Sequence, residues 1–237
     1  MVRTVFVWSC IGFATIVLGF LAFMTYPFDR KGRVVHRYAR LWGRIALWAG
    51  GVKVKIEGLD QIKEAGPYIF MSNHQGSYDI FSLLGYLPFQ FVWLAKKELF
   101  SIPFFGWTMA AARYIRVNRE GTRETVQAMN EAAEKIRHGI SVVIFPEGSR
   151  SPNGSIQPFK KGGFTLAIKA KVSIVPIAVH GSRDIMPKER LTATPGEIRI
   201  RIGHPIPTEP CSMKDRTSLM EKVRKTISHD FASISRE

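Results

Sequence analysis

The stretch YIFMSNHQGSYDI, residues 68–80, decides how we expect the chain to fold. An apolar run, a polar turn and a second apolar run follow one another, which is typical of a strand, a loop and a helix. His74 and Asp79 lie five residues apart, and this spacing puts two side chains on a common face of neither a helix nor a strand. If residues 73–77 form the turn and Ser77 caps a helix beginning near Tyr78, Asp79 can fold back towards the loop.

Two interpretations of this pair remain open on the stretch alone. His74 can accept a proton near neutral pH, and Asp79 can orient the imidazole and stabilise its charged form. Alternatively, His74 is an ordinary turn residue and Asp79 an aspartate that favours the start of a helix.

Similar apolar runs recur along the chain and alternate with helical patterns. The expected strands are 52–58, 68–73, 90–96, 113–118, 141–146, 173–180 and 197–203, and the expected helices lie near 79–86, 103–112, 121–138, 162–171 and 213–230. Such alternation predicts the α/β class, with a central, mostly parallel mixed sheet of about seven strands flanked by helices.

Polar motifs follow three of these strands, at the edge where ligands gather in α/β sheets. The first motif is the turn at 72–79. The second is VNRE (117–120), which contains Arg119, and the third is PEGSRS (146–151), which contains Glu147, Gly148 and Arg150. Gly148 allows a close backbone approach, Arg150 suits phosphate, and Glu147 is expected to hold that arginine or a substrate hydroxyl. Lys96 adds a cation at a further strand end, although single basic residues are commonly just solvated. We find no nucleotide-binding loop and no metal-ligand spacing.

A base and an acid need a nucleophile, and the sequence offers no obvious one. Ser72 and Ser77 are near His74, but neither lies in a GxSxG elbow. The substrate is therefore expected to supply the hydroxyl, with a serine hydrolase as the alternative.

The N-terminal segment indicates a membrane. Val5 to Tyr26 contains no charged residue and is longer than the apolar core of a signal peptide, the main alternative. Whether it spans the bilayer or enters one leaflet is open. A helix with a basic stripe follows, which is typical of a helix on an anionic bilayer, or else of an ordinary surface helix; the stripe is Arg33, Arg37, Arg40 and Arg44. This positive side is expected in the cytoplasm.

The length of the chain fits one sizeable domain, or one domain plus an appendage. The 237 residues carry a formal charge of +15, which suggests an anionic partner, whether a membrane, a nucleic acid or an acidic protein. Cys10 and Cys211 have no spacing typical of a disulfide framework or metal site. We place a boundary near Gly50–Gly51, with membrane-anchoring helices in 1–50 and the catalytic domain in 51–237.

Four ordered motifs together resemble the lysophosphatidic acid acyltransferases, the 1-acyl-sn-glycerol-3-phosphate O-acyltransferases of the glycerolipid acyltransferase superfamily. They are NHQGSYD (73–79), YIRVNR (114–119), FPEGSRS (145–151) and VPIAV (175–179), and the match covers most of residues 51–205. The chain departs from the family pattern at Gly76, where serine is usual, and at Ser149, where threonine is usual.

The resemblance implies that His74 is the base on the sn-2 hydroxyl of lysophosphatidic acid and that Asp79 orients it. The hydroxyl attacks the thioester of acyl-CoA or acyl-carrier protein without an acyl-enzyme, and phosphatidic acid results. The acceptor is held by Lys96, Arg119, Glu147, Gly148, Ser149 and Arg150. No metal or other cofactor is implied.

Anionic membrane lipids are the expected partner, and nucleic acid is not expected, since no DNA-binding module or aromatic stacking array is present. The location implied is a membrane, the bacterial inner membrane, with the catalytic domain facing the cytoplasm. Gly76 leaves the acceptor open, so another lysolipid, such as a lyso-ornithine lipid, is an alternative.

Overall fold

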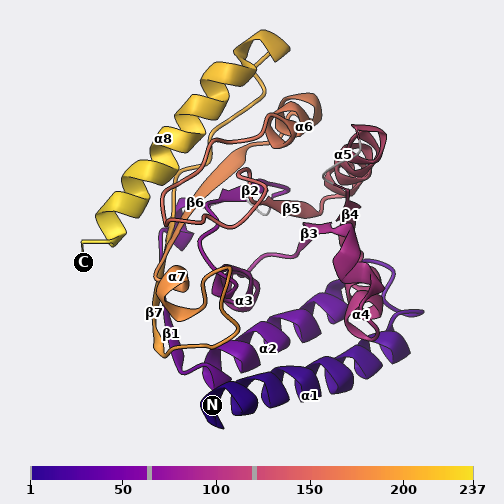
Figure 1. The fold of residues 1–237 in the computed structure, drawn as a ribbon. Coiled ribbons are helices and arrows are strands. Elements are labelled where there is room, and N and C mark those ends of the chain that lie inside the picture. Colours follow the sequence, from indigo (N-terminus) through magenta and orange to yellow (C-terminus); the bar gives the residue numbers. More distant parts are fainter. Residues whose placement is uncertain (1, 63–65, 119–121, 237) are drawn as a thin grey trace.

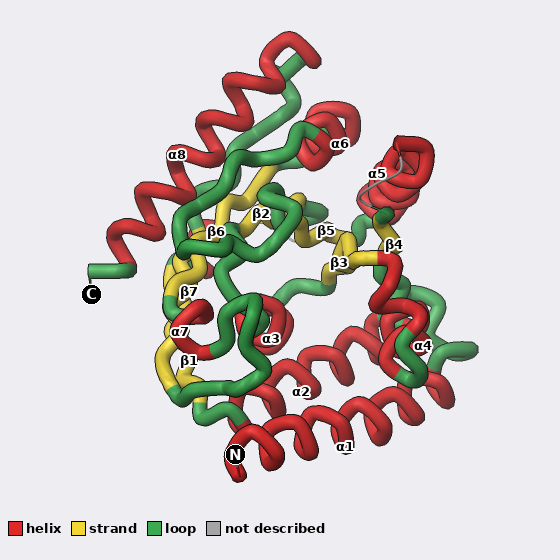
Figure 2. Tube along the Cα trace, in the orientation of Figure 1, coloured by secondary structure: helices red, strands yellow, loops and turns green. Residues whose placement is uncertain are grey.

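A seven-stranded sheet forms the centre of the molecule in a computed structural model that describes residues 2–62, 66–118 and 122–236 (Figures 1 and 2). The order across the sheet is β1-β7-β6-β2-β5-β3-β4, and every neighbouring pair is parallel except β6 with β7. The mostly parallel mixed sheet predicted from the sequence is therefore confirmed. The strands are β1 (Val52–Glu57), β2 (Ile69–Ser72), β3 (Phe91–Lys96), β4 (Ile115–Val117), β5 (Ser141–Ile144), β6 (Ile174–His180) and β7 (Gly196–Ile202).

Helices cover both faces of the sheet. In Figure 1, α5, α6 and α8 lie on one side, and α3, α2 and then α1 form successive layers on the other. All five helices expected after residue 51 are present, whereas the short α7 was not predicted. The helices are α1 (Val2–Thr25), α2 (Arg33–Ala49), α3 (Tyr78–Tyr86), α4 (Phe105–Ala111), α5 (Thr122–Arg137), α6 (Gly162–Ala170), α7 (Ser182–Ile185) and α8 (Arg216–Ile234).

Alternating side chains on the central strands build two hydrophobic cores. On β2, Ile69 and Met71 pack against the layer of α5, α6 and α8, while Phe70 faces the layer of α1, α2 and α3. Because both faces are covered, these strands are almost continuously apolar, as parallel strands usually are. Polar residues are consequently confined to the strand ends.

The two N-terminal helices share a core with the sheet. Val7 and Ile11 of α1 and Leu47 of α2 are buried in the same cluster as Phe70 and Tyr78. The turn between α1 and α2 is fixed by Asp29, whose carboxylate accepts hydrogen bonds from the first backbone N–H groups of α2, those of Arg33, Val34 and Val35. The division at residue 50 falls at the end of α2, and the assignment of 1–50 and 51–237 to separate parts stays a prediction.

A glycine contact lets α2 cross α3 closely. A Cβ atom at Gly43 would lie 2.9 Å from the carbonyl oxygen of Phe81 and 3.2 Å from the backbone nitrogen of Gly85. Both obstacles are backbone atoms, so they cannot swing away as a side chain can. This contact fixes how the N-terminal helices sit on the catalytic layer.

We expect Gly43→Val to lift α2 from α3 and to lower the free energy of unfolding by about 1–3 kcal/mol, the usual effect of overpacking. Gly12→Ala on α1 is a matched control, because a Cβ there meets nothing within 4 Å. The control is expected to be neutral or to stabilise by up to about 1 kcal/mol through helix propensity. Urea unfolding in detergent micelles measures both, and equal stability of the two variants would contradict the close crossing.

Candidate active site

Three loops meet at the carboxyl ends of the central strands β6, β2 and β5. The loop after β2 carries His74, the loop after β5 carries Phe145 to Ser151, and β6 leads into α7. The side chain of Asn73 joins the first and third: its Nδ2 donates to the Val179 carbonyl at 2.8 Å, and its Oδ1 accepts from the Val179 N–H at 2.8 Å. The amide thus continues the pairing of β2 with β6 for one step beyond the strand.

His74 and Asp79 form a buried pair. The Nδ1 of His74 lies 2.8 Å from Oδ2 of Asp79, and that oxygen also accepts the backbone N–H groups of Gln75 at 2.6 Å and Gly76 at 2.9 Å. Asp79 is fully buried, in the first turn of α3. A buried carboxylate needs such donors, and here they fold the loop around it. The expectation that Asp79 turns back across a strand-to-helix loop is confirmed.

The pair leaves one imidazole nitrogen available. With Nδ1–H donating to Asp79, the lone pair of His74 is on Nε2, which takes no hydrogen bond from the residues that the structure describes. The ring stacks on Phe145 at a centroid distance of 3.9 Å, and Phe145 stacks in turn on Trp93 at 5.3 Å. The imidazole is therefore held on an edge by a carboxylate and on a face by an aromatic ring, as a positioned base needs to be.

Glu147 acts as a clamp between loops. Its Oε1 accepts the backbone N–H of His74 at 2.7 Å, and its Oε2 accepts that of Gln157 at 2.8 Å. Burial raises the pKa of Glu147 to about 7; the two N–H donors lower it, and the nearby Asp79 raises it. Both carboxylate oxygens accept backbone N–H groups, and among the described residues neither pairs with Arg150, which donates to Ser77 instead. Binding of a substrate hydroxyl by Glu147 stays a prediction.

Arg150 lies beside the histidine loop. Its Nη1 donates to Oγ of Ser77 at 2.6 Å. Ser77 directly precedes α3, but its side chain caps no backbone N–H, so the predicted capping role is wrong. The reason is that Asp79 already takes the loop N–H groups and Arg150 takes the hydroxyl.

The other expected site residues lie further along the strand ends. Gly148 adopts a left-handed φ of 78°, and a Cβ there would lie 2.8 Å from the Lys160 side chain. Ser149 is exposed in the same turn. Lys96 ends β3, is exposed and pairs with Glu98 at 3.4 Å. Arg119 lies outside the described residues.

Sequence reasoning missed some residues that build the site. Asn73 ends the strand expected at 68–73, but the sequence does not indicate that its side-chain amide bonds the neighbouring strand. For Gln157 and for α7, the sequence contains no pattern that indicates a role in the site. In the described part of the chain, no three His, Cys, Asp or Glu side chains are grouped as metal ligands would be.

Comparisons with known proteins agree with this architecture. A family model described as Acyltransferase matches residues 53–180. The human 1-acyl-sn-glycerol-3-phosphate acyltransferase alpha is 34% identical over 78% of this chain and 66% of its own length. The 1-acyl-sn-glycerol-3-phosphate acyltransferase of Pseudomonas aeruginosa is 31% identical over 99% of this chain and 92% of its own. The crystal structure of the 1-acyl-sn-glycerophosphate (LPA) acyltransferase PlsC from Thermotoga maritima superposes with a TM-score of 0.86 at 25% identity, covering 100% of this chain and 96% of that one.

The chain therefore belongs to the acyltransferase family, as the four motifs predicted. The relatives named above all carry the more particular name of 1-acyl-sn-glycerol-3-phosphate or glycerophosphate acyltransferase. The chain spans just under two thirds of the length of the human relative.

The raised pKa of Glu147 predicts a pH dependence of stability. Between the ordinary glutamate pKa and about 7, the folded protein binds a proton that the unfolded chain lacks, so the free energy of unfolding falls as pH rises. This single group contributes a slope of at most about 1.4 kcal/mol per pH unit.

Urea unfolding at several pH values between about 4.5 and about 7 measures this slope. Glu147→Gln cannot titrate, so the slope should be flatter in this variant, whether or not the substitution changes the stability at any one pH. Glu209→Gln, at an exposed position, is the control and should keep the parent slope. An equal slope in Glu147→Gln and the parent would contradict the assignment.

Proposed function

We propose that the protein is a 1-acyl-sn-glycerol-3-phosphate O-acyltransferase. It transfers a fatty acyl group from acyl-CoA or acyl-carrier protein to the sn-2 hydroxyl of lysophosphatidic acid and makes phosphatidic acid. The observation that carries the proposal is the His74–Asp79 pair, with Nδ1 committed to a carboxylate and Nε2 free of the described residues. The names of the relatives support the same reaction.

The mechanism follows from this arrangement. The acceptor hydroxyl gives its proton to Nε2 of His74 as its oxygen attacks the thioester carbonyl. The tetrahedral adduct then collapses, the C–S bond breaks, and the imidazolium returns the proton to the departing sulfur. Asp79 at 2.8 Å and the face of Phe145 both stabilise the imidazolium while it exists. No cofactor takes part in these steps.

A serine hydrolase is the weaker proposal. It needs a serine hydroxyl bonded to the base, but the nearby hydroxyls are engaged elsewhere. Ser72 Oγ donates to the Asn73 carbonyl, Ser77 accepts from Arg150, and Ser151 Oγ donates to the Ser155 carbonyl. Among the described serines, none bonds to the His74 ring.

Arg150 supports a phosphate-bearing acceptor. It reaches the histidine loop, and a guanidinium is well suited to binding phosphate oxygens. Lys96, Arg119, Gly148 and Ser149 are proposed to complete the acceptor site. A lyso-ornithine lipid has no phosphate, so it uses this cation less well.

His74→Ala removes the proposed base, and we expect the rate of acyl transfer to fall by at least about 100-fold. The rate is measured with purified protein, supplied with lysophosphatidic acid or another lysolipid and with either thioester donor. The products are identified by mass spectrometry. His138→Ala is a matched control at an exposed position on the end of α5, and it should retain activity. Turnover of His74→Ala at the parent rate would contradict the proposed base, and an acyl-serine adduct would favour the hydrolase.

The lipid substrates require access to a membrane, and we propose that α1 lies in one leaflet. Among the described residues, α1 is the one helix long and apolar enough to cross a bilayer. It is, however, attached both to α2, which packs on the catalytic layer, and to the catalytic domain itself. Arg3 Nη2 donates to the Gly50 carbonyl, Trp8 Nε1 to the Leu191 carbonyl, and Thr15 Oγ1 accepts from Trp42. A helix that crossed the bilayer with these contacts intact would carry the polar catalytic domain into the hydrocarbon.

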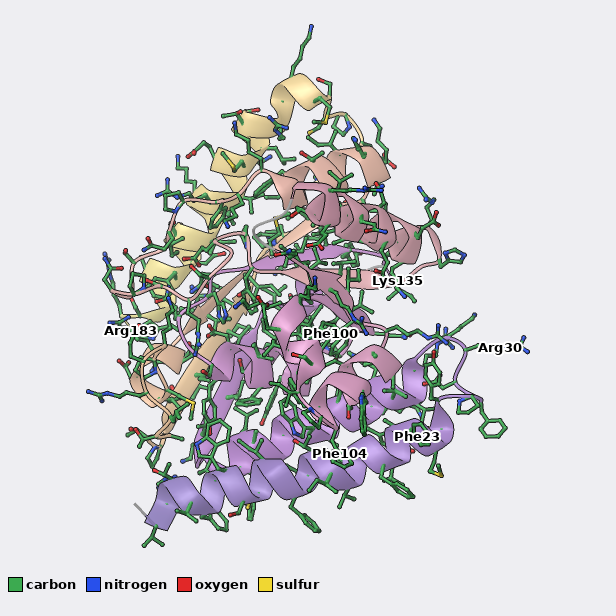
Figure 3. All side chains as sticks on the ribbon, turned by 45° about the vertical axis from the view of Figure 1, so that its right-hand side comes forward. Phe23, Arg30, Phe100, Phe104, Lys135 and Arg183 are labelled. Carbon is green, nitrogen blue, oxygen red and sulfur yellow. The ribbon has the colours of Figure 1, made fainter. Side chains whose placement is uncertain are left out.

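Apolar side chains on neighbouring elements support an in-plane position. Phe23 on α1 and Phe104, next to α4, are both exposed, and α1 packs against α4 (Figure 3). Phe104 adopts a φ of 61°, unusual for a non-glycine residue, and its ring contacts that of Trp107, which is 63% exposed. These rings extend the apolar surface of α1 and suit insertion among lipid headgroups and acyl chains.

The basic residues of α2 support an anionic, cytoplasmic leaflet. The helix contains four arginines and no acidic residue. Burial and the neighbouring Arg44 both lower the pKa of Arg40, so these cations gain from an anionic partner.

Cysteine labelling tests the in-plane position. Val2 and Phe28, near the two ends of α1, are each 87% exposed. In a background lacking Cys10 and Cys211, we expect Val2→Cys and Phe28→Cys to react from the same side of sealed vesicles with a membrane-impermeant maleimide. Glu209→Cys marks the side of the catalytic domain. Labelling of Val2→Cys and Phe28→Cys from opposite sides would indicate a spanning helix.

A further inference from the structure

Gly76 is one of the two positions at which this chain departs from the family pattern, and the structure gives a steric reason for the glycine. A Cβ atom at Gly76 would lie 2.3 Å from the carbonyl oxygen of Ser182 and 2.9 Å from that of Met186. Both belong to the backbone of the α7 segment, which directly follows β6. The segment is itself pressed inwards, because a Cβ at Gly181 would lie 2.2 Å from the Glu197 carbonyl oxygen. Any side chain at residue 76 would therefore displace α7.

The α7 segment holds the two active-site loops together. The backbone N–H of Ser77 donates to the Met186 carbonyl at 3.0 Å. Arg183 (Figure 3) donates from Nη1 to the carbonyls of Ser151 at 3.3 Å and Pro152 at 2.8 Å. One short helix thus contacts the loop of His74 on one side and the loop of Arg150 on the other.

The hydrogen bond from Arg150 to Ser77 also joins the two active-site loops directly. The hydroxyl takes one N–H of the guanidinium, and the described part of the chain binds none of its remaining donors. A hydroxyl also leaves the positive charge unneutralised, and among the described residues no carboxylate forms an ion pair with Arg150. The arginine is therefore both oriented and still able to attract an anion.

We propose that Ser77 is a positioning residue that sets Arg150 for the phosphate of the acceptor, and that Gly76 is required so that α7 can hold Ser77 in place. This inference rests on the proposed function. Residue 76 has no room for a side chain, so in this loop it is the hydroxyl of Ser77 that meets Arg150. Ser77 acts only through Arg150 and touches neither the hydroxyl that reacts nor the thioester.

The test compares Ser77→Ala with the parent on two acceptors, 1-oleoyl-sn-glycerol 3-phosphate and 1-oleoylglycerol, which lacks the phosphate. We expect the KM for the phosphate acceptor to rise about tenfold, as loss of a hydrogen bond to a charged group predicts, with kcat and the donor KM unchanged. Ser77→Thr keeps the hydroxyl and should restore the parent KM. Ser218→Ala, an exposed serine on α8, is the matched control.

The outcomes separate this inference from the proposed function. If the parent shows no turnover of the phosphate acceptor, the proposed function fails. If the parent is active and Ser77→Ala has the parent KM, or loses kcat equally on both acceptors, the positioning role is overturned. Gly76→Ala should show the same rise in KM and also lower thermal stability; if it does not fold, Ser77→Ala still decides.

Discussion

The buried carboxylate of Asp79 is the constraint on which the site depends. An ionised carboxyl group away from water is stable only with several donors, and Oδ2 receives three, from the His74 ring and the backbone of Gln75 and Gly76. Those bonds bend the chain between β2 and α3 into one conformation. The same bonds fix the tautomer of His74, so the need to stabilise one charge also determines which nitrogen can act as a base.

A second set of bonds fixes the loop relative to its neighbours. Asn73 joins it to β6, Glu147 joins it to the loop after β5, and the carbonyl of His74 accepts the N–H of Ser151. These contacts come from three strands that are adjacent in the sheet but far apart in sequence. The parallel order therefore brings polar motifs together at one edge, while the buried strands themselves carry almost no polar residues.

Much of this could be predicted from the sequence because its signals are local. Apolar runs located all seven strands to within about two residues, the error expected for element boundaries, and the spacing of His74 and Asp79 correctly indicated a strand-to-helix loop. The parts that could not be predicted depend on long-range contacts. Ser77 has the sequence signature of a helix cap, yet an arginine 73 residues away takes its hydroxyl. The four residues of α7 show no periodicity, and the steric role of Gly76 exists only because α7 packs against it.

The positions of the basic residues in the fold indicate the kind of partner better than the net charge of +15 does. Many basic residues on the catalytic domain have acidic neighbours; Lys55 and Arg199 pair with Glu197, and Arg201 pairs with Glu57. The arginines of α2, in contrast, follow an apolar helix whose outer face is exposed and have no acid within their own helix. Like charges one turn apart repel each other, so a sequence that keeps them there gives up some stability. An anionic surface beside α1 and α2 would compensate for that repulsion, whereas a free nucleic acid would leave the exposed aromatic rings of α1 in water. The distribution of charge and apolar surface together therefore favours a bilayer as the partner.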